Sequence, residues 1–91
     1  MFGKKIKVSE LGLNEAERFS IHSALEILKI VKFGIAEKLL QEYDSGTVPQ
    51  KDFRKIVEYV QISIEEMSGT DAEKAFGDFL ASAYEKIRRL G

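Results

Sequence analysis

Residues 14–43 read NEAERFSIHSALEILKIVKFGIAEKLLQEY, a long run without proline. Hydrophobic residues recur along it at intervals of three and four, which is the spacing of one face of an α-helix. Asn14 stands three residues before Glu17, and this pair is a variant of the capping box that begins many helices. The run therefore predicts one long helix from Glu15 to Tyr43, with a hydrophobic surface wide enough to need neighbours on more than one side.

Two shorter amphipathic stretches follow the first. A threonine stands three residues before Gln50 and another three residues before Glu73, so both stretches begin with the same capping pattern. Their hydrophobic residues also recur every three or four positions, which predicts helices over residues 49–67 and 71–90. We therefore expect an all-α fold, a three-helix bundle with a long first helix and two shorter antiparallel helices.

The remaining residues flank or connect these helices. Short stretches rich in glycine and serine separate the helices and favour antiparallel neighbours. Residues 1–13 form an N-terminal arm, in which Ile6 and Val8 alternate with lysines and predict a short strand. Residues 14–91 are expected to form a single helical-bundle domain, because a chain of 91 residues supports one core.

The first predicted helix is too long for the other two to cover. It would span roughly 44 Å, against roughly 28–30 Å for each of the others. Its first turns would therefore lack a neighbour, and exposed hydrophobic surface of this kind usually marks an interface. We expect a second copy of the chain to cover it, because small bundles often need the added burial. The predicted interface residues are Ala16, Phe19, Ile21, Ala24, Leu25 and Leu28.

Two other arrangements would cover the same surface. The arm could fold back over it with its hydrophobic residues, which are Phe2, Ile6, Val8, Leu11 and Leu13. The long helix could instead break near Ser20–Ser23, where weak helix formers cluster, which would give a fourth short helix. Gly34 lies in the middle of the predicted helix, where it is a close crossing point, a tolerated defect or a kink.

The sequence contains little that points to catalysis. Its only histidine, His22, lies one helical turn after Arg18. This pair loosely resembles the arginine and histidine of the metal-independent HEPN ribonucleases, but those usually have more residues between the two and a polar residue next to the arginine, a pattern that Arg18-Phe19-Ser20-Ile21-His22 misses. Cysteine is absent, which excludes thiol nucleophiles and thiolate zinc sites. An enzyme is therefore not favoured and no cofactor or metal is expected, with a small nuclease using Arg18 and His22 as the second alternative function.

Two basic clusters give the first alternative function, which is nucleic-acid binding. The formal net charge of the chain is −1, so no overall positive field attracts polyanions. Lysines and arginines nevertheless gather in the arm and in the last residues, where they could contact phosphates. These residues are Lys4, Lys5, Lys7, Lys86, Arg88 and Arg89.

The favoured function is a non-enzymatic helical interaction or assembly module. The uncovered hydrophobic surface supports it, and no motif for catalysis competes with it. Its expected partner is a second copy of itself, as a homodimer, or another protein in a larger complex. No signal peptide and no apolar stretch of about 20 residues is present, so we expect a cytoplasmic protein without a membrane partner.

Overall fold

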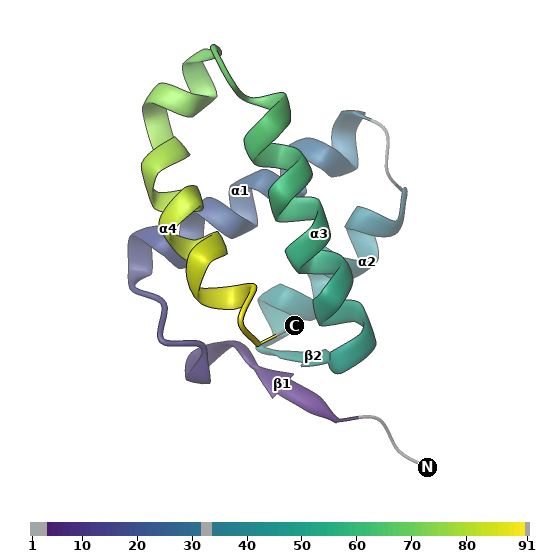
Figure 1. Ribbon diagram of the computed structural model, residues 1–91. Helices are drawn as coiled ribbons and strands as arrows, with labels where there is room; N and C mark the ends of the chain where they lie inside the picture. Colours follow the sequence, from purple (N-terminus) through teal and green to yellow (C-terminus); the bar gives the residue numbers. More distant parts are fainter. Residues whose placement is uncertain (1–3, 32–33, 91) are drawn as a thin grey trace.

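The computed structural model describes residues 4–31 and 34–90. Its described residues form four α-helices, in which most of the chain lies, and two short strands (Figure 1). The order along the chain is β1 (Lys5–Lys7), α1 (Glu15–Val31), α2 (Gly34–Ser45), β2 (Thr47–Pro49), α3 (Gln50–Glu66) and α4 (Asp78–Ile87). The mostly helical fold expected from the sequence is therefore present.

The long first helix predicted from Glu15 to Tyr43 is two helices, so that prediction is wrong. α1 ends at Val31, and α2 begins at Gly34 and returns along α1. The hydroxyl of Tyr43 in α2 donates a hydrogen bond of 2.9 Å to the carbonyl of Arg18 in α1. The chain folds back because a straight helix would leave its wide hydrophobic surface in water, whereas the hairpin buries much of it.

The fourth helix that the sequence allowed for is present, but the position of the break near Ser20–Ser23 is wrong, since both serines lie inside α1. Gly34 stands at the start of α2, and a Cβ placed on it would meet nothing within 4 Å. It is therefore not a close crossing point between helices. Its position at the start of α2, after α1 has ended, fits the role of a kink.

The second and third predicted helices agree with the structure more closely. α3 begins at Gln50 and ends at Glu66, within one residue of the predicted range. The last helical stretch starts at Asp71, passes through a π-helical segment at Glu73–Gly77 and continues as α4 to Ile87. The capping box predicted at the start of α3 does not form, because Thr47 belongs to β2.

The N-terminal arm is fixed to the helices by a small antiparallel sheet. Ile6 of β1 lies opposite Val48 of β2. The turn between α2 and β2 depends on Gly46, whose φ of +94° favours glycine. Beyond β1, Val8 and Leu11 are buried in the core. The arm therefore covers part of the helical layer with Ile6, Val8, Leu11 and Leu13, while Phe2 lies outside the described residues.

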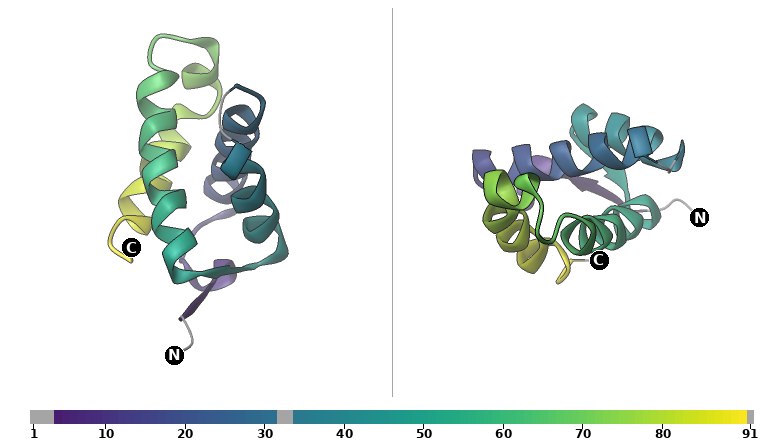
Figure 2. Two further views of the ribbon diagram at one scale, coloured as in Figure 1. Left: turned by 90° about the vertical axis from the view of Figure 1, so that its right-hand side faces the viewer. Right: turned by 90° about the horizontal axis from the view of Figure 1, so that it is seen from above.

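The core lies between two layers of helices. Figure 2 shows the α1–α2 pair on one side and the α3–α4 pair on the other. Both layers contribute side chains that are almost completely buried, which include Ile21, Leu25, Leu39, Phe53, Ile56, Leu80 and Ile87. Since α1 buries one face in this core, its opposite face is exposed to solvent.

Candidate functional site

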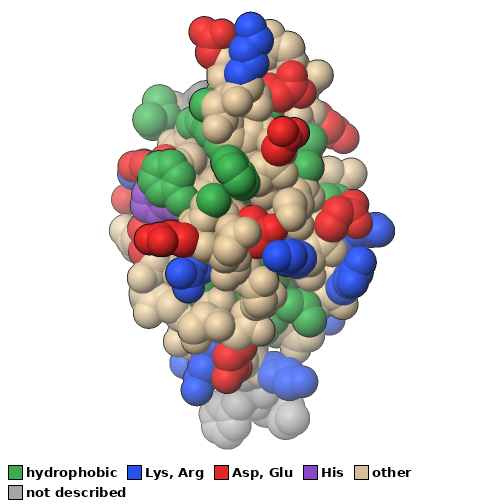
Figure 3. Space-filling view, turned by 90° about the vertical axis from the view of Figure 1, so that its left-hand side faces the viewer, with side chains coloured by type: hydrophobic (Ala, Val, Ile, Leu, Met, Phe, Trp, Pro, Cys, Tyr) green, Lys and Arg blue, Asp and Glu red, His purple; other side chains and the backbone are tan. Residues whose placement is uncertain are grey.

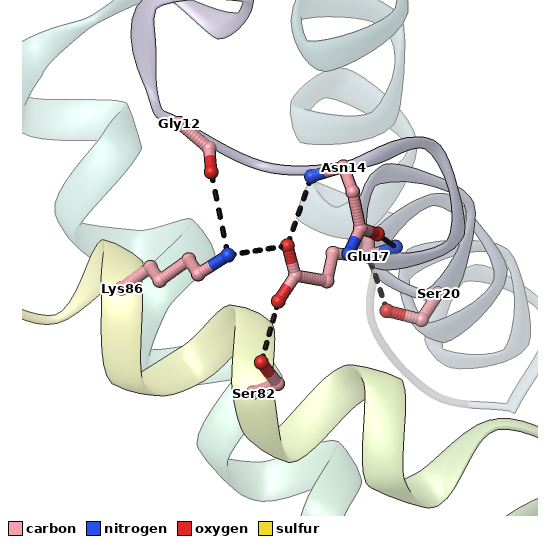
Figure 4. A network of polar contacts seen from close by, with 6 residues as sticks. All are labelled: Gly12, Asn14, Glu17, Ser20, Ser82 and Lys86. Carbon is pink, nitrogen blue, oxygen red and sulfur yellow. Dashed lines mark hydrogen bonds and ion pairs between the residues drawn. The ribbon is translucent and has the colours of Figure 1, made fainter.

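A buried carboxylate network fixes the orientation of α1 (Figure 4). Glu17 and Asn14 form the predicted capping box, with N–H to side-chain oxygen distances of 2.9 and 2.8 Å. The carboxylate of Glu17 also accepts hydrogen bonds from Ser82 and from Lys86, whose Nζ lies 2.8 Å away. These donors, with Lys86 first, lower the pKa of Glu17 from 4.5 to about 2. The start of α1 is therefore held against α4, which sets the face that α1 turns outward.

Most of the predicted interface residues face inward. Ile21, Ala24, Leu25 and Leu28 are buried within a single chain, so a second copy would not reach their side chains. The physical reason is that α2, α3 and α4 all pack against α1 and cover the surface that a continuous first helix would have left bare. Ala16 is half-buried, and Phe19 remains 64% exposed.

The exposed hydrophobic surface of α1 lies on its other side. Phe19, Ile27 and Ile30 are 64%, 42% and 80% exposed. Their spacing of eight and three residues places them on one face, with half-buried Ser23 midway between Phe19 and Ile27. We call Ala16, Phe19, Ser23, Ile27 and Ile30 the α1 outer stripe.

A second exposed aromatic ring lies on α4. Phe79 of α4 is exposed and stands three residues before Ser82, the residue that contacts Glu17 of α1. Figure 3 shows hydrophobic side chains gathered beside the single histidine on the face that includes α4. The sequence analysis did not identify Ile27 and Ile30 as surface residues, although their spacing already placed them on the same helix face as Phe19. It could not assign a side, because α1 has hydrophobic residues on both.

His22 lies in a charged cluster between α1 and α2. Its Nδ1 is 2.8 Å from Asp44 Oδ1 and its Nε2 is 3.3 Å from Glu26 Oε2. The ring of Phe19 stacks on His22 at a centroid distance of 6.4 Å. Arg18 and His22 do line the same shallow hollow. A general base needs a ring nitrogen free to take the substrate proton, and both nitrogens of His22 face carboxylates. This arrangement joins α1 to α2 and supports the nuclease alternative poorly.

The basic arm and the basic tail lie at the same end of the molecule (Figure 1). Lys4, Lys5, Lys7 and Leu90 line one hollow of about 230 Å³. The tail is partly neutralised, since Lys86 pairs with Glu17 and Arg88 pairs with Glu85 at 2.8 and 3.0 Å. The start of α3 adds further cations there, because the Gln50 N–H donates to the Lys4 carbonyl at 2.8 Å. These cations are Lys51, Arg54 and Lys55.

Metal sites and membrane spans leave recognisable patterns of side chains. Within residues 4–31 and 34–90, no three His, Asp or Glu side chains lie close enough together to hold a metal ion. In the same described part, no helix combines the length and the apolar character needed to cross a membrane.

Comparison with protein-family models, with curated proteins and with solved structures finds no match to this chain.

Proposed function

We propose that this protein is a non-enzymatic assembly module that forms a homodimer through the α1 outer stripe. The observation that carries the proposal is the exposure of Phe19, Ile27 and Ile30 on one face of a helix. Large hydrophobic side chains that share a helix face and lie in water mark an interaction surface. The proposal keeps α1 as the interface helix and moves the contact to its outer face.

The order of residues in the stripe suits pairing with an identical copy. Phe19 and Ile27 stand four residues before and after Ser23, and Ala16 and Ile30 stand seven residues before and after it. In a twofold contact, residue i of one copy contacts residue j of the other, and residue j of the first copy contacts residue i of the second. Two antiparallel α1 helices crossing at Ser23 would therefore place Phe19 against Ile27 and Ala16 against Ile30. The small side chain of Ser23 would allow the helices to approach closely.

The size of these side chains is consistent with a weak, reversible dimer. Fully burying an exposed Phe or Ile contributes roughly 1.5–3 kcal/mol. A twofold contact counts Phe19, Ile27 and Ile30 twice, although Ile27 is already more than half buried. The summed gain is comparable with the roughly 4–15 kcal/mol that association costs in lost freedom of motion.

Sedimentation velocity over a range of protein concentrations tests this proposal. We expect the wild type to dimerise and Phe19→Asp and Ile30→Asp to sediment as monomers, because each buries a charge in the contact. Leu90→Asp is the matched control, since Leu90 is an exposed hydrophobic residue outside the stripe. Circular dichroism shows whether each variant keeps its helices. A wild type that stays monomeric removes the homodimer, and capture of a different protein by the stripe would then be the remaining form of the assembly role.

A second candidate function is nucleic-acid binding at the basic end. The supporting observation is that the arm lysines, the end of α4 and the start of α3 gather in one place. Several acidic residues lie toward the other end, where α3 ends and the chain leads into α4, at Glu65, Glu66, Asp71, Glu73 and Asp78, although Glu10 lines the basic hollow itself. A local positive surface can bind phosphates even on a chain whose net charge is near zero.

Fluorescence anisotropy with labelled single- and double-stranded oligonucleotides tests the second candidate. Binding should weaken steeply between about 50 and 200 mM salt if phosphates supply the affinity. Replacing Lys4, Lys5 and Lys7 with glutamate should abolish it, whereas Lys29→Glu on α1 should leave it unchanged. Absence of binding at low salt rules this candidate out.

A further inference from the structure

A hydrophobic cavity of about 270 Å³ opens between α1 and the end of α3. Ala24 and Leu28 of α1 and Met67 after α3 form its inner wall, and all three are buried. Ile27 and Ala72 lie on its more open side. The cavity is distinct from the α1 outer stripe, with which it shares only Ile27 among its lining residues.

One polar group in the cavity wall has no partner. Ser63 of α3 is 5% exposed, and its Oγ makes no hydrogen bond. Leaving a buried hydroxyl unsatisfied is costly, so such groups usually pair with protein, water or a ligand. The other hydroxyl in the wall, that of Thr70, already donates to the Met67 carbonyl. A buried water needs two to four polar partners, and the remaining walls are mainly hydrocarbon.

We propose that this cavity binds a small, uncharged, mainly hydrophobic molecule whose single polar atom hydrogen-bonds to Ser63. Pockets for such ligands combine apolar walls with a few placed polar groups. The ligand should be uncharged, because the exposed carboxylate of Glu66 lies at the rim and none of the described residues that line the cavity is a cation. A dry cavity of about 150 Å³ binds benzene, so this larger one has room for a two-ring aromatic alcohol or a medium-chain alcohol.

Paired titrations with 2-naphthol and naphthalene test the proposal, because the two probes differ by one hydroxyl. Fluorescence should show saturable binding of both to the wild type, with 2-naphthol tighter by roughly two- to tenfold, the worth of one net hydrogen bond. Ser63→Ala should bind naphthalene as before and lose the preference for 2-naphthol. This variant should fold at least as stably as the wild type, because it removes an unsatisfied buried hydroxyl.

Two further variants locate the site. Ala72→Leu should weaken both probes by filling the cavity, whereas Ala81→Leu, at an exposed alanine of α4, should not. Phe19→Asp should retain binding, which separates this site from the proposed dimer. The proposal is overturned if the wild type binds neither probe, if it binds both equally, or if Ser63→Ala keeps the preference. Loss of binding in Phe19→Asp would also contradict a site built within one chain.

Discussion

At the scale of single residues, Glu17 links local sequence to tertiary structure. Its capping partner Asn14 is three residues away, whereas Ser82 and Lys86 come from α4. The sequence predicts the first contact, because capping boxes have a fixed spacing. It does not predict the other two, since nothing in a local pattern shows which distant helix will supply the donors. A residue expected only to cap a helix therefore also joins α1 to α4.

The lowered pKa of Glu17 makes stability depend on pH. Its folded-state pKa of about 2 lies below the ordinary value of 4.5, so its contribution is present above pH 4.5 and is lost as pH falls toward 2. We expect Glu17→Gln to lose about 2–3 kcal/mol at neutral pH and to show a flatter acid profile. Urea unfolding of both proteins between pH 2 and pH 7 measures this. Glu15→Gln, at an exposed neighbour, is the control, and an equal loss in both variants would contradict the assignment.

Glu42 has the opposite behaviour. Burial and then a hydrogen bond with Asp52 raise the pKa of Glu42 above 4.5, so the folded state holds this proton more tightly than the unfolded state. The resulting stability is present below pH 4.5 and is lost as pH rises through the raised pKa. Glu42→Gln should therefore stabilise the protein at pH 7, by about 1 kcal/mol, with little gain at pH 4. Thermal melts at both pH values measure it, with Glu58→Gln as an exposed control. A destabilised variant at pH 7 would show that the ionised pair is not repulsive.

At the scale of helices and strands, the sequence predicts element type better than element length. The periodicity of residues 14–43 identifies helix throughout, and α1 and α2 together occupy nearly all of that run. It does not reveal the hairpin, because α1 and α2 follow the same periodic pattern. The choice is made by burial, since folding back places Leu39 and Leu40 in the core. The two strands also show what a local pattern can predict. The alternation at Ile6 predicts β1, whereas β2 is a strand only because it pairs with β1, which is distant in the sequence.

The hairpin should not depend on a special conformation of Gly34. This residue is exposed, and a Cβ on it would meet no atom within 4 Å. Gly34→Ala should therefore raise the stability by about 0.5–1 kcal/mol, by favouring helix at the start of α2 and restricting the unfolded chain. A rise in melting temperature with unchanged sedimentation is the expected result. A fall in stability, or a change in oligomeric state, would show that glycine is required for the change of direction.

At the scale of the whole molecule, two layers of helices bury one face of α1 and leave the other to solvent. The sequence predicts an interface on this helix from its excess of hydrophobic residues. It could not indicate the interface side, because the inward set around Leu25 and the outward set around Ser23 both follow helical spacing. Only the packing of α2, α3 and α4 against α1 distinguishes the two sets, and much of this packing joins residues far apart in the sequence.

Disulfide trapping at Ser23 tests the proposed dimer most directly, because the chain has no cysteine of its own. Helix axes crossing at 8–10 Å bring facing Cα atoms to roughly 3–5 Å, near the range that a disulfide spans. Ser23→Cys should therefore oxidise rapidly to a covalent dimer, whereas Ser68→Cys, at an exposed serine outside the stripe, should remain monomeric under the same conditions. Adding Phe19→Asp to Ser23→Cys should abolish the trapping. A Ser23→Cys protein that cross-links no faster than Ser68→Cys would contradict the twofold contact through α1.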